Sequence, residues 1–350
     1  MTPELASPRG SDYAALCRQV KQSGLLDRRL TYYAWKITLT AVALAVGWAA
    51  FVVIGDSWWQ LGTAVFLAVV WGQIGFLGHE AGHSQVFSSR RNNTILGLAC
   101  GNLATGVSFA WWTGKHNRHH ANPNTEGADP DIMISVLAFS GARAQGGRGL
   151  QRLIFRYQAY LLIPMLFLES ISLHVSSFPV VARRGCRHRA WEASLLAVHY
   201  AAYLGVVFLV LSPVKAVVFI LVQQGLFGFY LACSFAPNHK GMPILEASTK
   251  TDFLRRQVLT SRNVHGGWFT DIALGGLNYQ IEHHLFPSMP GPNLPRAQAL
   301  VAAFCAERDV TYTQTTLLTS YAQALGHLAA IGSELARPST VKAAPVPAQR

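Results

Sequence analysis

Four apolar stretches, each long enough to cross a lipid bilayer, constrain the fold of this chain more than any other feature. They lie at residues 34–54, 59–78, 191–211 and 214–236. A hydrocarbon core of roughly 30 Å is crossed by about 20 helical residues. In addition, 51% of the residues are hydrophobic and only 13% are charged, against about 25% charged residues in a typical soluble domain. The sequence therefore predicts an all-α integral membrane protein.

Short links join the four stretches in pairs. Gly55-Asp56-Ser57 separates the first two, and Ser212-Pro213 separates the last two. Because such a link returns the chain to the side that it left, we predict two helical hairpins. We expect residues 1–30 to form a cytoplasmic N-terminal segment and residues 31–332 to form the membrane domain. Residues 333–350 are rich in Pro and Ala and are expected to be a disordered tail.

Two further apolar stretches, 94–113 and 153–178, have basic residues at both ends. Lys and Arg favour the cytoplasmic side of a membrane, so a stretch with two basic ends is expected to return to the side that it left. We therefore predict interfacial or re-entrant helices at both places. The cytoplasmic side then carries a histidine-rich cap made of residues 79–152, 179–190 and 237–350.

Membrane topology also accounts for the formal net charge of +12. The basic residues flank apolar stretches and do not form a face interleaved with aromatic residues, so a lipid bilayer is the expected partner and no nucleic acid is. The five cysteines show no CxxC pair. Neither a disulfide framework nor an iron–sulfur site is predicted.

Eight of the 13 histidines fall in four short clusters. His79-Glu80-Ala81-Gly82-His83 ends the second stretch, and His116-Asn117-Arg118-His119-His120 and Gln280-Ile281-Glu282-His283-His284 lie in the cap, where His239 follows the fourth stretch. Histidines three or four residues apart project from one helix face. Because topology places them all on one side of the membrane, we expect them to form one site. The predicted metal ligands are His79, His83, His116, His119, His120, His239, His283 and His284.

The number of histidines narrows the choice of metal, although imidazole alone suits iron, copper and zinc. Structural zinc takes four protein ligands and catalytic zinc commonly three. Eight imidazoles therefore indicate two ions with open positions. Two redox-active irons could activate O2 against an unactivated C–H bond, and protein side chains have no group that does this.

The three multi-histidine clusters resemble those of the membrane fatty acid desaturases. HEAGH, HNRHH and QIEHH are similar, in order and placement, to that family's boxes HxxxH, HxxHH and QxxHH. The likeness extends to SFAPNHKGMP, TSRNV and GGLNYQIEHHLFPSMP, and covers roughly residues 30–310. Gln280 stands where stearoyl-type acyl-CoA desaturases have histidine, as in the front-end subgroup and many bacterial acyl desaturases.

The resemblance implies an enzyme that inserts a cis double bond into a fatty acyl chain carried on CoA or on a lipid. It implies two iron ions held by the seven box histidines with His239 as an additional ligand, and O2 as co-substrate, with no catalytic residue beyond the ligands. No HPGG-like haem motif occurs. A separate ferredoxin or cytochrome with its reductase is therefore the expected electron donor.

Polar residues near the histidines are candidates to orient the imidazoles, because a metal-bound imidazole usually donates its other N–H to a carboxylate or carbonyl. The candidates are Asn238, Gln280, Asp129 and Asp131. A capped loop is an equal alternative for the acidic run that contains Asp129 and Asp131.

Other functions fit parts of the sequence. A related di-iron lipid hydroxylase would use similar boxes. HEAGH also satisfies the HExxH motif of a zinc metalloprotease, with Glu80 as general base, but that mechanism leaves six clustered histidines without a role. A transporter could use Glu169, His174 and His199, for which packing or tunnel lining is the expectation instead. His188 and His327 are expected to be solvated. Glu80 is expected to be either solvated or beside a metal ligand, and His265 is the next ligand candidate.

Overall fold

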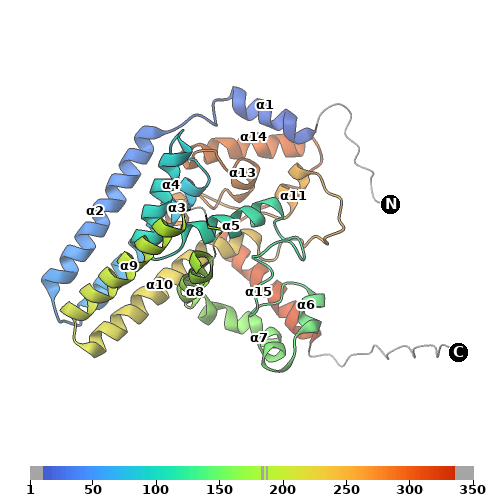
Figure 1. Ribbon diagram of the computed structural model, residues 1–350. Helices are drawn as coiled ribbons and strands as arrows, with labels where there is room; N and C mark the ends of the chain where they lie inside the picture. The colour runs from blue at the N-terminus through green and yellow to red at the C-terminus, as the bar shows by residue number, and fades with distance from the viewer. Residues whose placement is uncertain (1–10, 183–184, 187, 336–350) are drawn as a thin grey trace.

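The computed structural model describes residues 11–182, 185–186 and 188–335, and nearly all of its regular structure is helical (Figure 1). Among these residues the strands are β1 (Asn263–Val264) and β2 (Gln314–Thr315), which pair in parallel. The mostly helical fold confirms the predicted all-α class.

Four helices are long and apolar enough to cross a membrane, and they coincide with the four predicted stretches. They are α2 (Leu30–Ile54), α3 (Gln60–Gly82), α9 (Arg189–Val210) and α10 (Pro213–His239). The helices α3 and α10 continue a few residues beyond the predicted ends, because the polar residues that follow each apolar stretch remain helical. This extension places His79 in the last turn of α3 and His239 at the last residue of α10.

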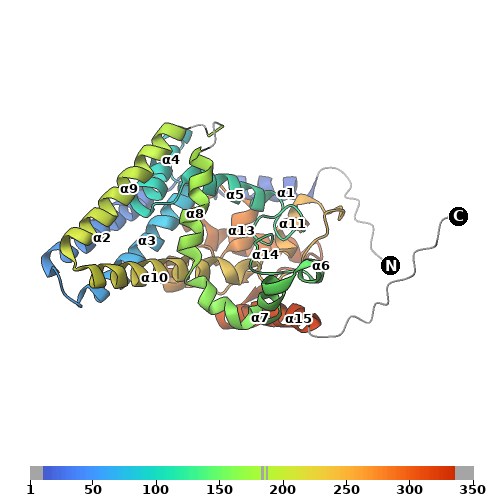
Figure 2. The same cartoon turned by 60° about the horizontal axis from the view of Figure 1, so that its bottom comes forward.

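The two additional apolar stretches form bent pairs of helices. The first contains α4 (Arg90–Leu98), the π-helix η1 (Ala99–Thr105) and α5 (Phe109–Ala121), with a bend of 114°. The second contains α7 (Gly149–Leu166) and α8 (Glu169–Ala182), with a bend of 84°. Figure 2 shows α8 turning away from α7. Neither stretch is one straight span, and the interfacial or re-entrant placement of both stays a prediction.

A polar cluster holds the first bend. Gly106, at φ +71°, ends η1 in the left-handed conformation that glycine adopts without strain. Its carbonyl oxygen lies 3.0 Å from Nδ1 of His174 and accepts a hydrogen bond of 3.0 Å from the Tyr200 hydroxyl. His199 contacts the Leu103 carbonyl through Nδ1 at 2.9 Å. His174 and His199 therefore pack against this bend and do not line up on one span.

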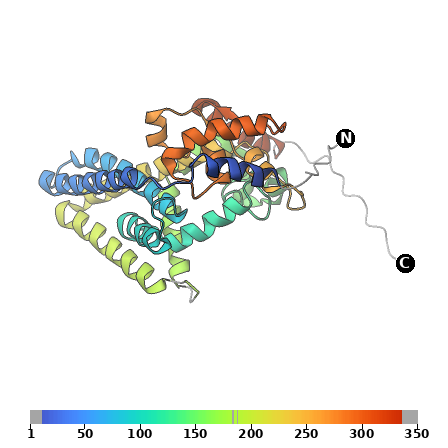
Figure 3. The same cartoon turned by 90° about the horizontal axis from the view of Figure 1, so that it is seen from above.

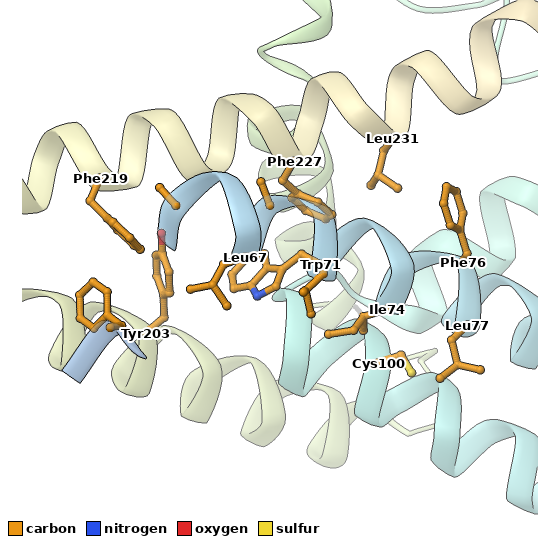
Figure 4. Packing of buried hydrophobic residues seen from close by; sticks show 14 of the residues in the cluster. Leu67, Trp71, Ile74, Phe76, Leu77, Cys100, Tyr203, Phe219, Phe227 and Leu231 are labelled. Atoms are coloured by element: carbon orange, nitrogen blue, oxygen red, sulfur yellow. The ribbon is translucent and has the colours of Figure 1, made fainter. Parts of the chain in front are cut away.

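The helix α3 lies at the centre of the bundle, packed against α2, α10 and η1. Figure 4 shows Trp71 between Phe227 of α10 and Tyr203 of α9, with Leu67 and Ile74 on the same helix. The outer face of α2 is apolar and exposed, with Val53 85% accessible. Apolar exposure on this scale fits a lipid environment.

The other helices gather beyond one end of the long bundle, and four of them form a second core from Leu16, Leu254, Ile281, Phe304 and their neighbours (Figures 1 and 3). They are α1 (Asp12–Gln22), α6 (Gly141–Gly146), α11 (Phe253–Leu259), α12 (Trp268–Ala273), α13 (Gln280–Leu285), the 3-10 turn η2 (Gly291–Asn293), α14 (Leu294–Ala306) and α15 (Leu317–Glu334). Of the predicted tail, Ser333 and Glu334 are helical, and residues 336–350 lie outside the described part of the chain.

Candidate metal centre

All eight predicted histidines come together where four helices meet. The helix α3 carries His79 in its last turn and is capped by His83, α5 carries His116, His119 and His120, α10 ends at His239, and α13 carries His283 and His284. The imidazole nitrogens form two compact groups, each with its atoms within 4.8 Å of one another. One contains His79, His83, His116 and His283, and the other contains His119, His239 and His284.

His120 joins the two groups. Its ring stacks on that of His284 with centroids 4.1 Å apart, and its centroid lies 4.5 Å from that of His83. Its Nε2 is 3.0 Å from Nε2 of His116. The eight imidazoles thus form one continuous cluster and not two separate sites.

In the second group, hydrogen bonds fix which ring nitrogen carries the proton. Nδ1 of His119 lies 3.0 Å from Asp129 Oδ1, Nδ1 of His239 lies 3.0 Å from the Thr260 carbonyl, and Nδ1 of His284 lies 2.9 Å from Gln257 Oε1. These oxygens only accept, so each Nδ1–H donates. Each Nε2 therefore presents a lone pair.

The three lone pairs point at one another. Nε2 of His239 is 3.3 Å from Nε2 of His119 and 3.1 Å from Nε2 of His284. Metal–nitrogen bonds of about 2.1 Å place neighbouring ligand nitrogens about 3.0–3.4 Å apart, for bond angles of about 90–110°. The donor set therefore fits a bound metal ion.

The first group has the same character. Nε2 of His79 lies 3.1 Å from Nε2 of His116. His83 Nε2 and His283 Nε2 are buried and have no hydrogen-bond partner among the described residues. A buried nitrogen without a partner destabilises a fold by about 1–3 kcal/mol. Binding of a cation by these atoms would offset that cost.

Burial keeps the cluster neutral. It lowers the pKa values of His283 and His284 well below the ordinary range, and the neighbouring histidines lower them further. Burial, followed by the electrostatic effect of His119, lowers the pKa of His83 to about 3. Neutral imidazole is the form that binds metal.

The two predicted aspartates lie beside His119. Asp129 is fully buried and accepts backbone hydrogen bonds from Asn124, at 2.7 Å, and Asp131, at 2.8 Å, in addition to its contact with His119. Burial raises the pKa of Asp129, and the hydrogen bond with His119 lowers it. Together with the electrostatic effect of His119, the result is a pKa below the ordinary value of an aspartate. Asp131 lies 3.5 Å from His119 Nδ1 and pairs with Lys115 at 2.6 Å. The carboxylate of Asp129 thus caps its loop and also contacts a histidine. The capped loop and the contact with an imidazole, which the sequence analysis gave as alternatives, occur in the same residue.

The two predicted amides also lie in the cluster. Gln280 Nε2 is 2.9 Å from His239 Nε2, and Asn238 Nδ2 donates to Gln280 Oε1 at 3.2 Å. Both side chains are buried. Asn238 is therefore one step removed from the imidazoles, while Gln280 touches one of them.

Three partners of the cluster were not predicted from the sequence. The Thr260 carbonyl and Gln257 contact imidazoles, and Arg262 is fully buried. The Arg262 guanidinium donates to the carbonyls of Pro237, at 2.5 Å, and Ser320, at 3.3 Å, and also bonds the Lys240 carbonyl and Gln323. The only signal in the sequence was the presence of Thr260 and Arg262 in TSRNV.

His327 differs from the expectation of a solvated side chain, and for Glu80 burial excludes the solvated one of its two alternatives. Glu80 is buried and pairs with Lys36 at 2.5 Å, because α2 crosses the end of α3 there. That pairing does not suit the general base of a zinc protease. His327 is half-buried, with Nε2 2.9 Å from the Phe139 carbonyl, because α15 packs under the loop that contains Phe139. His188 is exposed as expected, and His265 is exposed and lies outside both groups.

An apolar cavity of about 60 Å³ reaches the cluster at His79. Its walls come from α3, α4, η1, α5 and α10. Glycines at four positions on α3, α4 and η1 make room for it. Among the lining residues are Gly75, Gly78, Gly97, Gly101, Phe109 and Leu231. With about 60 Å³, the cavity has room for a short segment of an apolar chain, and that segment would lie beside His79.

Comparison with known proteins agrees with this geometry. The model of the fatty acid desaturase family matches residues 56–316. An acyl-lipid (9-3)-desaturase of Physcomitrium patens is 30% identical over 93% of this chain and 62% of its own length. A delta(6)-fatty-acid desaturase of Caenorhabditis elegans is 30% identical, with coverages of 90% and 74%, and a delta(5) fatty acid desaturase of the same organism is 31% identical, with coverages of 88% and 71%.

The chain thus spans 62–74% of the length of these relatives, and the family match includes all eight clustered histidines. The same part of the sequence builds the apolar cavity. This chain belongs to the fatty acid desaturase family.

Proposed function

We propose that this chain is a membrane fatty acid desaturase that inserts a cis double bond into a fatty acyl chain held on a lipid or on CoA. In the overall reaction two hydrogens leave the acyl chain, O2 accepts them with two electrons and two protons, and two waters form. The observation that carries the proposal is the cluster of eight histidines, six of them buried, beside an apolar cavity. The names of the relatives point to the same reaction.

The proposed cofactor is a pair of iron ions. The group of His79, His83, His116 and His283 would hold one, the group of His119, His239 and His284 would hold the other, and His120 lies between them. When bound, iron supplies the redox chemistry with O2 that side chains lack. Zinc shares the ligand type, so the element is a proposal that analysis of metal content tests.

The protein's own residues have three tasks in this proposal. Asp129, Gln257 and the Thr260 carbonyl hold three imidazoles with Nε2 turned inward. The cavity positions an apolar chain beside His79. Burial of the histidines excludes bulk water from the reacting atoms.

The proposed topology places α2–α3 and α9–α10 in the membrane as hairpins, with the histidine-rich cap on the cytoplasmic face. The bent pairs would be interfacial or re-entrant. Electrons would come from a ferredoxin or a cytochrome with its reductase. Reconstituted enzyme should need such a donor, and turnover with NAD(P)H alone would contradict this part of the proposal.

Lipid profiling of cells that express the chain tests the reaction. A new unsaturated fatty acid, found in the lipid or acyl-CoA fraction and missing with His120→Ala, is expected. The exposed His188 provides a matched control, since His188→Ala should retain the product. A hydroxy acid in place of the alkene would show the related hydroxylase reaction and overturn the desaturase assignment.

A further inference from the structure

The short helix α12 turns a large apolar surface outward. Trp268, Phe269 and Ile272 are 78%, 68% and 58% exposed. These residues belong to the segment between strand β1 and the helix α13, which carries His283 and His284. Neighbouring exposed apolar side chains of this size mark a surface that contacts something other than water.

The far side of α12 is anchored on two membrane helices. Gln73 of α3 donates to the Ile272 carbonyl at 3.0 Å, and Tyr230 of α10 donates to the Ala273 carbonyl at 2.7 Å. Gln73 precedes His79 by six residues, or about 9 Å along the helix. The C-terminal end of α12 is therefore attached to α3 at a position closer to the middle of that helix than His79 is.

The exposed surface of α12 continues a lipid-facing stripe of α3. Leu61, Val65 and Val69 are all exposed. Spacing by four places them on one helix face, and the next position of that face is Gln73. The stripe therefore leads directly to the point where α12 begins to cover α3.

Hydrogen bonding on α12 suits an apolar environment. The last carbonyls of a helix have no partner within it, and in lipid each unpaired group is costly. Gln73 and Tyr230 supply donors to two of them. Asp271 of the same helix is turned toward the protein, where it accepts from Asn278 at 2.8 Å and from the Tyr279 hydroxyl at 3.2 Å.

We propose that α12 is inserted in the bilayer, with Trp268, Phe269 and Ile272 in contact with lipid acyl chains. An outward apolar face with tryptophan is typical of helices that lie in a membrane interface. The inference rests on the proposed membrane location of α3 and α10. It corrects the expectation that all of 237–350 faces the cytoplasm, and it anchors α13, with His283 and His284, to the membrane.

Spin labelling of the full chain in lipid nanodiscs tests the insertion. The background replaces the partly exposed Cys17, Cys186 and Cys233 by serine. One label is attached at Phe269→Cys, and a second, independent label position on the same helix is Ile272→Cys. Val69→Cys on α3 is the lipid control and Ser248→Cys, in an exposed loop, is the aqueous control. Frequent collision of the spin label with O2 indicates a lipid environment, and frequent collision with a water-soluble nickel complex indicates exposure to water.

The label at position 269 is expected to behave like the one at Val69, with high access to O2 and loss of nickel access relative to Ser248. Nickel access equal to that of Ser248 would overturn the proposal. Low access to both reagents would show that protein covers α12, as in a second copy or a partner, and would also overturn it. Nickel access at Val69 itself would instead overturn the membrane placement of α3 and, with it, the insertion of α12.

Discussion

His239 lies outside the three sequence boxes, yet its imidazole is held like those of the box histidines. Nδ1 contacts the Thr260 carbonyl at 3.0 Å, and Nε2 is 3.1 Å from Nε2 of His284. Loss of a ligand from a site with few spare ones lowers metal affinity. We therefore predict that His239→Ala lowers the iron content, measured by elemental analysis, and abolishes product as His120→Ala does.

The matched control is His188→Ala, which should keep both iron and product because His188 is exposed. Normal iron content in His239→Ala would show that His239 is not a ligand. His265, which is exposed and outside both groups, would then be tested next.

Gly97 controls the width of the apolar cavity. A methyl group at this position would meet the Phe109 ring at 2.2 Å, so the ring must move, and Phe109 and Gly97 both line the cavity. We predict that Gly97→Ala narrows the cavity and lowers product formation from long acyl chains, with shorter chains affected less. Gas chromatography of products from acyl chains of graded length measures the change.

Gly205→Ala in α9 is the matched control, because no described atom of a neighbouring side chain or backbone lies within 4 Å of a methyl group there. Alanine is also favoured over glycine in a helix by about 1 kcal/mol, so product should not fall. An unchanged chain-length profile in Gly97→Ala would exclude this cavity as the acyl site.

The sequence predicted the histidines but not the groups that orient them. Clusters at helical spacing are a local signal, and all eight side chains lie together in the structure. The Thr260 carbonyl and Gln257 reach the imidazoles only because α11 folds over the end of α10. A backbone carbonyl also leaves no trace in residue type, so such partners could not be predicted from the sequence.

Arg262 stabilises the end of a whole element, α10. Its guanidinium lies among carbonyls of the last residues of α10, where the helix has its partial negative charge. Each buried carbonyl left without a donor costs about 1–3 kcal/mol. We predict that Arg262→Met lowers the melting temperature and releases iron from the group that contains His239, while Arg262→Lys, which keeps the charge, does so less.

Arg255→Met is the matched control. Arg255 pairs with Asp12 and Asp252, which are partly exposed, and such surface pairs contribute about 0–1 kcal/mol. The control should therefore retain its iron and nearly all of its thermal stability. Equal iron content in Arg262→Met and the unmodified protein would refute the role of Arg262 in holding His239.

At the level of elements, long apolar runs were predictable and short ones were not. All four spans were found within a few residues, because a run of about twenty apolar residues is typical of a membrane-spanning helix. Flanking charge led to the prediction of interfacial or re-entrant helices, but the bends themselves depend on distant partners such as His174 and Tyr200 at Gly106. The helix α12 has six residues, too short for any hydropathy signal.

For the whole molecule, bound metal should stabilise the fold. The Nε2 atoms of His119, His239 and His284 lie close together, and ligands that bind only the folded state raise stability by mass action, by about 2.7 kcal/mol at a hundred times Kd. We predict that a chelator lowers the melting temperature, and that Fe(II) restores it at about two ions per chain. Restoration by one zinc with proteolytic activity would contradict the iron assignment.

Topology is the property on which the whole assembly depends, because every histidine must reach one side of the membrane. The links of the two proposed hairpins lie together at the opposite end of the bundle, where Asp56 accepts a hydrogen bond of 2.9 Å from the Ser212 backbone and pairs with Lys215 at 3.1 Å. We therefore predict that tags near residue 145, near residue 186 and at the C-terminus are cytoplasmic. Cysteines at positions 56 and 212 should react with impermeant reagent only from the other side. Exposure of residue 186 on the non-cytoplasmic side would make the α7–α8 pair a true span, leave an odd number of crossings before α9 and break the two-hairpin arrangement. Exposure of positions 56 and 212 on different sides of the membrane would separate the two hairpins that the Asp56 contacts join.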